Sequence, residues 1–308
     1  MEEKPLKRIV SVSLGSPKRD KRVEIEILGE RFQIERIGTG GDLEKARQLF
    51  ASLDGKVTVL CVGGTDLWLR AGKRRYPIRD AFRMVRDVRQ TPLVDGGGIK
   101  TSWERHLILD YLPRVHGISF RGKRVLLVSS VDRYGMAEAF VEAGADVIFG
   151  DFIFALGLPI PLRTLRSVQI LAALLLPILT RLPFRILYPT GERQEIITPK
   201  HHRYYQWAEV IAGDFHLIRR YMPEDLRGKV IFTNTVTSED VEELRRRGVH
   251  LLITSAPEID GRSFGTNIIE GIVVALSGKG PEELTPGDYL EWLGRIGFAP
   301  RVEALNPV

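Results

Sequence analysis

The sequence predicts an α/β protein of two domains: a small N-terminal α/β substrate domain, then a Rossmann-type doubly wound parallel sheet. Its length of 308 residues suggests two domains. From residue 123 onward, short apolar runs alternate with helical patterns. These runs are apolar throughout, which is typical of strands buried on both faces of a parallel sheet.

The second domain is expected at residues 119–280. Its predicted strands are the apolar runs at 124–130, 145–151, 184–190, 209–214, 229–236 and 250–257. Its predicted helices lie at 134–144, 162–182, 216–228, 237–248 and 265–278. Six strands with helices between or after them are the count of a dinucleotide-binding domain.

The first 118 residues form a different unit, the predicted substrate-binding domain. Strand patterns lie at 7–16, 21–39, 56–64 and 91–97, and helical patterns lie at 42–55, 78–90 and 100–112. The segment 21–39 contains the turn sequence Leu-Gly-Glu-Arg at 28–31 and predicts a hairpin. The last segment, 281–308, predicts a helix that packs back on the first domain.

The net charge of +6 suits a small anionic substrate. Basic residues gather at 16–22, 71–80 and 244–248, but acidic residues are interspersed, so we do not expect nucleic-acid binding. A surface this rich in charges of both signs is also typical of thermophilic proteins. The single cysteine, Cys61, excludes a disulfide framework, and the six histidines lack metal-ligand spacing, so no metal is expected.

The longest apolar stretch, residues 170–179, is too short to cross a membrane. The N-terminus is too polar for a secretory leader, so we expect a cytoplasmic protein with no membrane partner. A homo-oligomer is left open as an alternative to a monomer.

The turn after the strand at 124–130 is the predicted pyrophosphate site. Backbone amides and the helix dipole favour a phosphate where a strand leads into a helix. The residues expected to serve it are Ser129, Ser130, Asp132, Arg133, Tyr134 and Gly135. The usual G-x-G-x-x-G pattern is absent, so an ordinary strand-to-helix turn is the alternative.

Asp151 ends the next strand, about 20 residues further on, where an acid holds the adenosine ribose of NAD. An acid there repels a 2′-phosphate, so NAD is predicted rather than NADP. An ordinary loop or cap aspartate is the alternative reading. Polar side chains at the ends of the late strands are expected to line the nicotinamide crevice: Asn234, Thr235, Thr254 and Ser255.

The glycine run at 96–98 marks the predicted catalytic residues in the first domain. Lys100 beside Asp95, or beside Asp66 at the end of the preceding strand, could exchange a proton with a substrate hydroxyl. Lysine suits this role because partial burial lowers its pKa. A flexible loop with a solvated lysine is the alternative.

A second glycine-rich segment precedes the last predicted helix of the second domain. Arg262, Thr266 and Asn267 are the expected substrate ligands there: the loop could close over the cofactor, or Arg262 could donate to a substrate carboxylate. The alternative is a plain connector that ends in a helix cap at Thr266 or Asn267.

The chain as a whole resembles quinate 5-dehydrogenases and, more distantly, the shikimate/quinate dehydrogenase superfamily. The segment at 11–20 is similar to the superfamily's Ser-Leu-Ser-Pro segment, which implies that Ser13 and Ser16 hold a substrate carboxylate. The superfamily's catalytic lysine and aspartate look most like Lys100 with Asp95 or Asp66. Its glycine-rich dinucleotide loop is replaced here by the segment 129–135.

The predicted function is NAD-dependent oxidation of a polyhydroxylated cyclic carboxylic acid such as quinate or shikimate. Two alternatives share the same fold. One is a non-catalytic nucleotide- or metabolite-binding protein with a regulatory role. The other is a transferase that uses a nucleotide-bearing donor.

Overall fold

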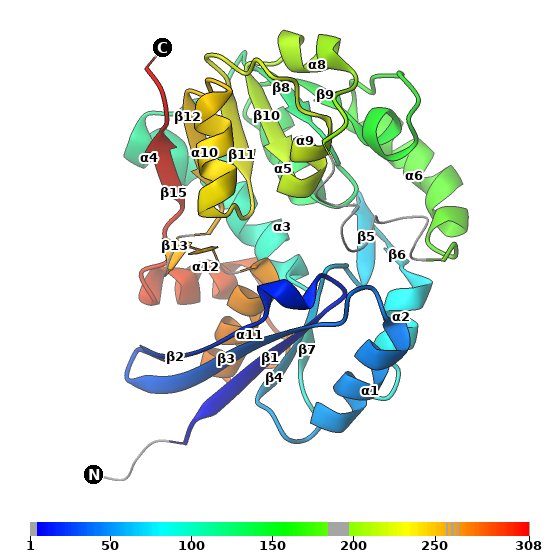
Figure 1. Cartoon of the computed structure of the whole chain (residues 1–308), viewed down its shortest axis with the longest axis vertical. Helices are drawn as coiled ribbons and strands as arrows, with labels where there is room; N and C mark the ends of the chain where they lie inside the picture. Colours follow the sequence, from blue (N-terminus) through cyan, green and yellow to red (C-terminus); the bar gives the residue numbers. More distant parts are fainter. Residues whose placement is uncertain (1–4, 184–196, 257, 260–261, 264, 308) are drawn as a thin grey trace.

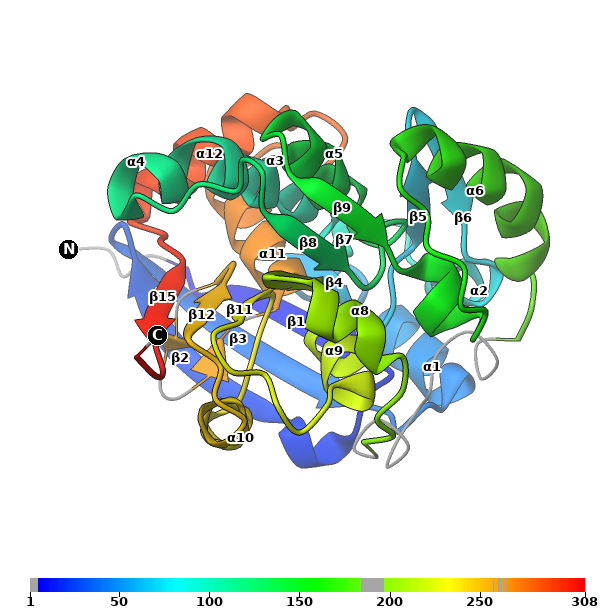
Figure 2. The same ribbon diagram turned by 90° about the horizontal axis from the view of Figure 1, so that it is seen from above.

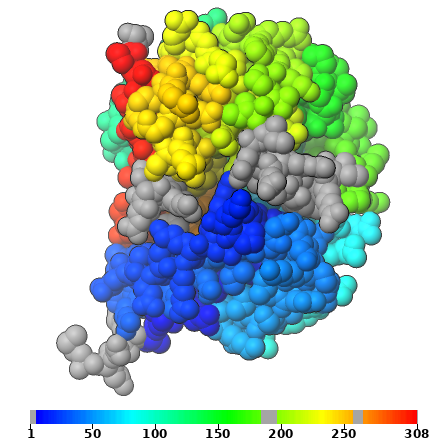
Figure 3. Space-filling view, viewed as in Figure 1, coloured from blue at the N-terminus to red at the C-terminus, as the bar shows by residue number. Residues whose placement is uncertain are grey.

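The computed structural model describes residues 5–183, 197–256, 258–259, 262–263 and 265–307. Within them the chain forms two α/β lobes, which lie one above the other in Figure 1 and in the space-filling view of Figure 3. The fold class is the predicted one, because each lobe is built on a mainly parallel sheet. The predicted strand at 184–190 lies outside the described residues.

The first lobe holds a five-stranded sheet in the order β2-β3-β1-β4-β7. Its strands are β1 (Lys7–Ser13), β2 (Lys21–Ile27), β3 (Glu30–Gly38), β4 (Val59–Gly63) and β7 (Leu93–Val94). All neighbours pair in parallel except β2 and β3, which form the predicted antiparallel hairpin. The two residues of its turn, Leu28 and Gly29, have φ of 53° and 74°, as a tight hairpin requires.

The second lobe holds a six-stranded sheet in the order β15-β12-β11-β10-β8-β9. Its strands are β8 (Arg124–Leu127), β9 (Asp146–Phe149), β10 (Val210–Gly213), β11 (Val230–Thr233), β12 (Leu251–Thr254) and β15 (Arg301–Ala304). The first five are parallel, as predicted, whereas β15 pairs antiparallel with β12. The chain places β9 on one side of β8 and β10 on the other, so the strand order reverses between β8 and β10. Ligands of such sheets bind at this switch point, beyond the carboxyl ends of the strands.

Helices and short elements complete the two lobes. The helices are α1 (Leu43–Leu53), α2 (Arg79–Val85), α3 (Gly97–His106), α4 (Leu112–His116), α5 (Tyr134–Glu142), α6 (Leu165–Leu179), α8 (His202–Trp207), α9 (Phe215–Tyr221), α10 (Ser238–Arg246), α11 (Thr266–Ser277) and α12 (Pro286–Arg295). The short elements are the turns η1 (Pro17–Arg19), η2 (Leu107–Tyr111) and η3 (Asp151–Ala155), and the strand pairs β5 (Trp68–Ala71) with β6 (Arg74–Pro77) and β13 (Glu258–Ile259) with β14 (Arg262–Ser263). No helix among the described residues is long and apolar enough to cross a membrane.

Helix α11 crosses from the second part of the sequence back to the first lobe. We expected it to close the second domain, but it packs on β1 and β4. The physical reason is its apolar surface on several sides, which needs burial all round. Gly271 lets it approach the sheet, because a Cβ there would lie 2.8 Å from the Cys61 sulfur.

The segment 281–308 serves both lobes. Helix α12 packs against α3 and α11, so it returns to the first part of the chain in the manner expected. The strand β15 that follows adds an edge to the second sheet, where we expected no strand. One edge of the second sheet, the pair of β12 and β15, therefore joins residues far apart in the sequence.

Candidate functional site

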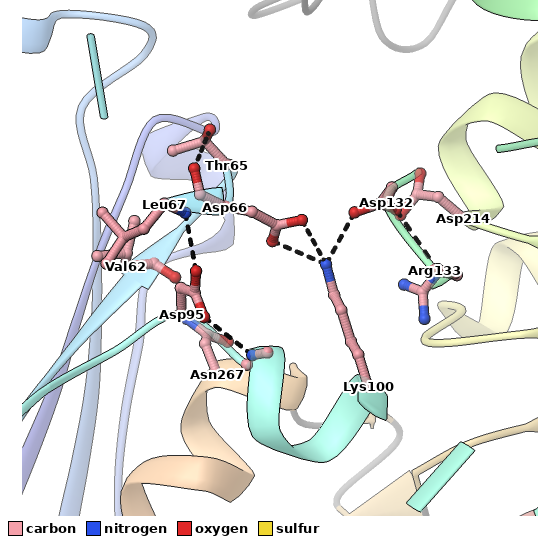
Figure 4. Close-up of polar contacts among 12 residues, drawn as sticks. Val62, Thr65, Asp66, Leu67, Asp95, Lys100, Asp132, Arg133, Asp214 and Asn267 are labelled. Atoms are coloured by element: carbon pink, nitrogen blue, oxygen red, sulfur yellow. Dashed lines mark hydrogen bonds and ion pairs between the residues drawn. The ribbon is translucent and has the colours of Figure 1, made fainter. Parts of the chain in front are cut away.

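The site is centred on the side chain of Lys100, which extends from α3 to the boundary between the lobes (Figure 4). Its Nζ donates to both carboxylate oxygens of Asp66, at 2.7 and 2.8 Å, and to Oδ1 of Asp132 at 2.9 Å. Asp66 follows β4 and Asp132 follows β8, so one ammonium joins the carboxyl ends of the two sheets. We call Lys100, Asp66 and Asp132 the lysine cluster. All three side chains are less than 20% exposed.

Asp95, the other predicted partner of Lys100, has a different role. Its carboxylate accepts the amides of Leu67 at 2.8 Å and Gly97 at 2.9 Å. It therefore fixes the backbone beside Asp66 and at the start of α3. The structure brings Lys100 together with Asp66, and adds Asp132, which we had assigned to a phosphate.

The charge state of the lysine cluster differs from our expectation. Burial does lower the pKa of Lys100, but Asp132 and Asp66 outweigh it, so the pKa is raised and the ammonium persists. Burial raises the pKa of Asp66; Lys100 opposes this, and the charge of Asp132 adds to it. Burial opposes ionisation of Asp132 as well, yet Lys100, then Asp66 through a hydrogen bond, and then Arg133 hold its pKa low. Within the cluster the pKa of Asp66 is therefore raised and that of Asp132 is lowered, so the environments of the two carboxyl groups push their pKa values apart.

The glycine run before Lys100 allows close packing and does not make a flexible loop. Gly96, with φ of 93°, and Gly98 donate their amides to the two oxygens of Glu270, at 2.6 and 2.9 Å. The Tyr289 hydroxyl donates to the same carboxylate at 2.8 Å. A Cβ on Gly98 would lie 2.3 Å from Oε1 of Glu270. The glycines thus seat α3, and with it Lys100, against α11 and α12.

Replacing Gly98 with alanine should lower the free energy of unfolding by about 1–3 kcal/mol, because the new methyl group must displace buried Glu270 and Tyr289. Urea denaturation measures the loss. Gly294→Ala is the matched control, since a Cβ there meets nothing within 4 Å. Equal stability of the two variants would show that α3 is not seated in this way.

Glu270 makes stability depend on pH. Burial raises its pKa to about 7, and Asp95 adds to the shift, whereas the three donors oppose it. The folded state then holds a proton that the unfolded state releases near its ordinary pKa of 4.5. The contribution to stability is full below pH 4.5, falls as the pH rises to 7, and is constant above.

We expect the free energy of unfolding of the wild type, minus that of Glu270→Gln, to fall by up to about 3 kcal/mol between pH 4.5 and 7. The glutamine variant lacks the titrating proton, so the difference isolates this group. Denaturation at several pH values measures it. A difference that is constant, or that grows with pH, would contradict the raised pKa.

The predicted pyrophosphate turn is held from within by Asp151. One oxygen accepts the amides of Ser130 at 2.9 Å and Val131 at 3.1 Å, and the other accepts the Ser130 hydroxyl. Burial raises the pKa of Asp151, although these donors oppose the shift. Both oxygens that we assigned to a ribose are thus used by the turn itself.

Asp151→Asn should lower the free energy of unfolding by about 1–3 kcal/mol, because an amide group turns a donor toward buried N–H or O–H groups. Thermal or urea unfolding measures it. Asp146→Asn, at the exposed start of the same strand, is the control and should change stability little. If both variants match the wild type, the Asp151 carboxylate is free for a ligand after all.

We expected Arg133 to face a phosphate, but the structure places it elsewhere. Its guanidinium is 1% exposed, contacts Glu104 of α3, and lies 3.7 Å from Asp132. Tyr134 is also used internally, since its hydroxyl accepts from Gln169 at 2.7 Å. Gly135 brings α5 close to α3, because a Cβ there would lie 3.0 Å from the carbonyl oxygen of Lys100.

The predicted nicotinamide residues lie at the carboxyl ends of β11 and β12, as expected. The Asn234 amide donates to Asp214 at 3.1 Å, and the Thr254 hydroxyl donates to the Ala256 carbonyl at 2.6 Å. The Ser255 carbonyl accepts a hydrogen bond from the indole N–H of Trp103 at 2.6 Å. Thr235 and Ser129 are half-buried.

Asp214 was missed by the sequence analysis. It follows β10 and therefore lies at the switch point, near Asp132 and Arg133 (Figure 4). Its carboxylate accepts the amide of His216 and so begins α9. The signal available in the sequence was its position directly after an apolar run, which Asp151 shares.

Ser13, a predicted substrate ligand, is paired with a cation that we missed. Its hydroxyl accepts from Nη2 of Arg36 at 3.0 Å and from the amide of Gly15 at 3.1 Å. Arg36 also contacts Asp20, at 2.8 Å. Ser16 caps η1 by accepting the amide of Lys18. A carboxylate at this end of β1 would thus meet a serine and an arginine.

Asn267, another predicted substrate ligand, also lies beside β1, next to Ser11. The Asn267 amide donates to the Ser11 hydroxyl at 2.9 Å and the Val62 carbonyl at 3.0 Å, which fixes α11 to the first sheet. Thr266 is buried against Gly96. The side chain of Arg262 lies outside the described residues.

A second polar contact joins the lobes near the cluster. Arg19, at the end of η1, lies 3.2 Å from Nε2 of His216 on α9. Together with the lysine cluster, it connects the carboxyl ends of both sheets across the boundary. Among the described residues there is no group of three or more His, Cys, Asp or Glu side chains placed to hold a metal ion.

Two family models match consecutive parts of the chain. Residues 98–305 match the model described as Domain of unknown function (DUF8754), so the chain belongs to that family. Residues 8–95 match a second model, described as Domain of unknown function (DUF8753). The two matches meet at the glycine run that begins α3. No curated protein matches the chain.

Solved structures match the chain at low similarity. A galactofuranose binding protein is 11% identical, covers 94% of this chain and 98% of its own, and has a TM-score of 0.38. The hetero-hexameric glutamate dehydrogenase from Thermus thermophilus is 14% identical, with coverages of 96% and 74% and a TM-score of 0.43. A putative malic enzyme is 13% identical, with coverages of 95% and 85% and a TM-score of 0.36.

Proposed function

We propose that this protein is an enzyme that transfers a proton to or from a small anionic hydroxy acid at the boundary between its lobes. The observation that carries the proposal is the lysine cluster. Its buried ammonium lies between carboxylates from both sheets, at the switch point where ligands of such folds bind. Strongly shifted pKa values of this kind gather at functional sites.

The residues of the cluster divide the work. Asp66, with its raised pKa, is the group that accepts a proton from a substrate hydroxyl or returns it to a carbonyl. Lys100 stays charged and stabilises negative charge that develops on the substrate oxygen. Ser13 and Arg36 provide donors for the substrate carboxylate.

The reaction to test first is the one that the sequence resemblance implies, NAD-dependent oxidation of a quinate- or shikimate-like acid. NAD would supply the hydride acceptor. The turn at residues 129–135 does not fit a pyrophosphate as it is folded, because Arg133 is buried on Glu104 and Asp132 carries a negative charge.

A second candidate function follows from that misfit. A protein that binds an anionic metabolite without turnover needs Ser13, Arg36 and the lysine cluster, but it needs no dinucleotide. Asp151, the acid expected to select NAD over NADP, already accepts hydrogen bonds from Ser130 and Val131 of the turn. This favours the second function. Such a protein would have a sensing or regulatory role.

One experiment separates the two functions. Absorbance of NADH is followed after the protein is mixed with NAD and quinate or shikimate, and calorimetry measures binding of each compound alone. Under the first proposal, turnover appears, rises with pH as Asp66 loses its proton, and is lost in Asp66→Asn but not in the exposed control Lys56→Met. Binding of the acid without turnover supports the second function, and absence of binding contradicts both.

A further inference from the structure

A groove lies between the β5–β6 hairpin, α5 and α6. The groove has a volume of about 820 Å³, which suits a small ligand. The hairpin stands beside α6 in both views (Figures 1 and 2). No residue of the lysine cluster lines this groove. Thr101 and Gly135 do line it, and they lie close to Lys100 and Asp132 in the sequence.

The hairpin brings cations together without counter-ions. Arg70 and Arg75 stand directly opposite each other in the antiparallel pair, where like charges destabilise a sheet. Lys73 lies in the turn between the two strands, and Arg74 begins β6. Among the residues that the structure describes, none of these four forms an ion pair, whereas Lys100, Arg245 and Arg247 are each paired with an acid.

Arg70 is the member of this group held in place. It is partly buried, and its Nη1 donates to the neutral hydroxyl of Thr101 at 2.8 Å. Burial and then the charge of Arg75 lower its pKa, while Glu138 and Asp95 act in the opposite direction. Glu138 is the one acid among the described lining residues, and burial raises its pKa.

The walls of the groove are fixed by contacts between three elements. Gln169 of α6 donates to the Tyr134 hydroxyl at 2.7 Å. Gly72, with φ of 62°, lies against Gln169, and a Cβ there would be 3.0 Å from its Nε2. Ile170 and Ala173 continue the wall as an apolar surface, with Ile170 about half exposed.

We propose that this groove binds a small phosphate-bearing ligand, such as a mononucleotide, at a site separate from the lysine cluster. Arg70, Lys73 and Arg74 hold the phosphate, and Ile170 and Ala173 contact the less polar part of the ligand. Several cations on one hairpin match a group with two or more negative charges better than a single carboxylate. A hollow with fixed walls favours a small molecule over an extended polymer.

Calorimetry on the full chain with AMP, inorganic pyrophosphate and inorganic phosphate tests the proposal. We expect one AMP per chain, with an affinity that falls as salt is raised. Arg70→Gln should weaken binding about tenfold or more, since a charged hydrogen bond is lost. The exposed pair Lys73→Ala/Arg74→Ala should weaken it similarly without a risk to folding, and the exposed control Arg89→Gln should not.

Three results would overturn the proposal. The first is no binding of any of these compounds at millimolar concentration and low salt. The second is binding that is unchanged in both hairpin variants. The third is a single-stranded oligonucleotide that binds more tightly than AMP and is lost in the same variants, which would make the hairpin a nucleic-acid surface. Because no turnover is measured, failure here leaves the proposed proton transfer untouched, and the reverse also holds.

Discussion

Lys100→Met should lower the free energy of unfolding by about 3–5 kcal/mol at pH 7, because it leaves Asp66 and Asp132 buried beside each other without their cation. Methionine keeps most of the volume of the side chain, so lost packing contributes little. The loss should shrink as the pH falls. Without the ammonium, the pKa of each carboxyl in the folded state rises above its unfolded value, so stability is retained at acid pH and lost as the pH rises. Urea denaturation at pH 4 to 8 measures both effects.

Two further variants make this prediction specific. Lys56→Met, at an exposed position, should be close to the wild type. Adding Asp132→Asn to Lys100→Met removes one of the two facing charges and should regain part of the loss. A loss that is equal at every pH would mean that the ammonium is not the counter-ion of the cluster. If the proposed proton transfer is correct, Lys100→Met also lowers turnover about 10²–10⁴-fold.

Local patterns were enough to predict most of the fold. The continuous apolar runs marked β8 to β12, because strands covered on both faces have no polar side. The hairpin of β2 and β3 was visible in its turn. Pairing across long stretches of sequence was not visible: β15 reads Arg-Val-Glu-Ala, with partly buried residues typical of an edge strand. The return of α11 to the first sheet was equally hidden, since any sheet could cover its apolar surface.

Several residues of the site could be predicted from the sequence, but the contacts between them could not. Lys100 and Asp66 were selected from glycines and strand ends, and the structure brings them together. Their charges could not be read from the sequence, because the pKa of Lys100 depends on Asp132, which follows β8 of the second sheet. Asp151 stood at the right place for a ribose, yet whether a carboxylate faces a ligand or the neighbouring turn is decided by backbone amides that no side-chain pattern reports.

Glu104→Leu should lower the free energy of unfolding by about 3–5 kcal/mol, because Arg133 is then left buried without its main counter-ion. Burial raises the pKa of Glu104, and Arg133 opposes this shift, which shows how closely each charge depends on the other. Asp132, at 3.7 Å, offers Arg133 only partial compensation. Urea denaturation measures the loss.

The chain contains a matched control one residue further along α3. Arg105 of α3 pairs with Glu142 of α5, but this pair is exposed, so Glu142→Leu should cost at most about 1 kcal/mol. The double variant Glu104→Leu/Arg133→Met should return close to wild-type stability, because one atom of each buried partner, Oε2 of Glu104 and Nε of Arg133, has no hydrogen bond. If Glu104→Leu lowers the free energy of unfolding no more than Glu142→Leu does, the Arg133 guanidinium can reach solvent in the variant. The turn at residues 129–135 could then offer a cation to a phosphate, and our objection to a dinucleotide at this position would fall.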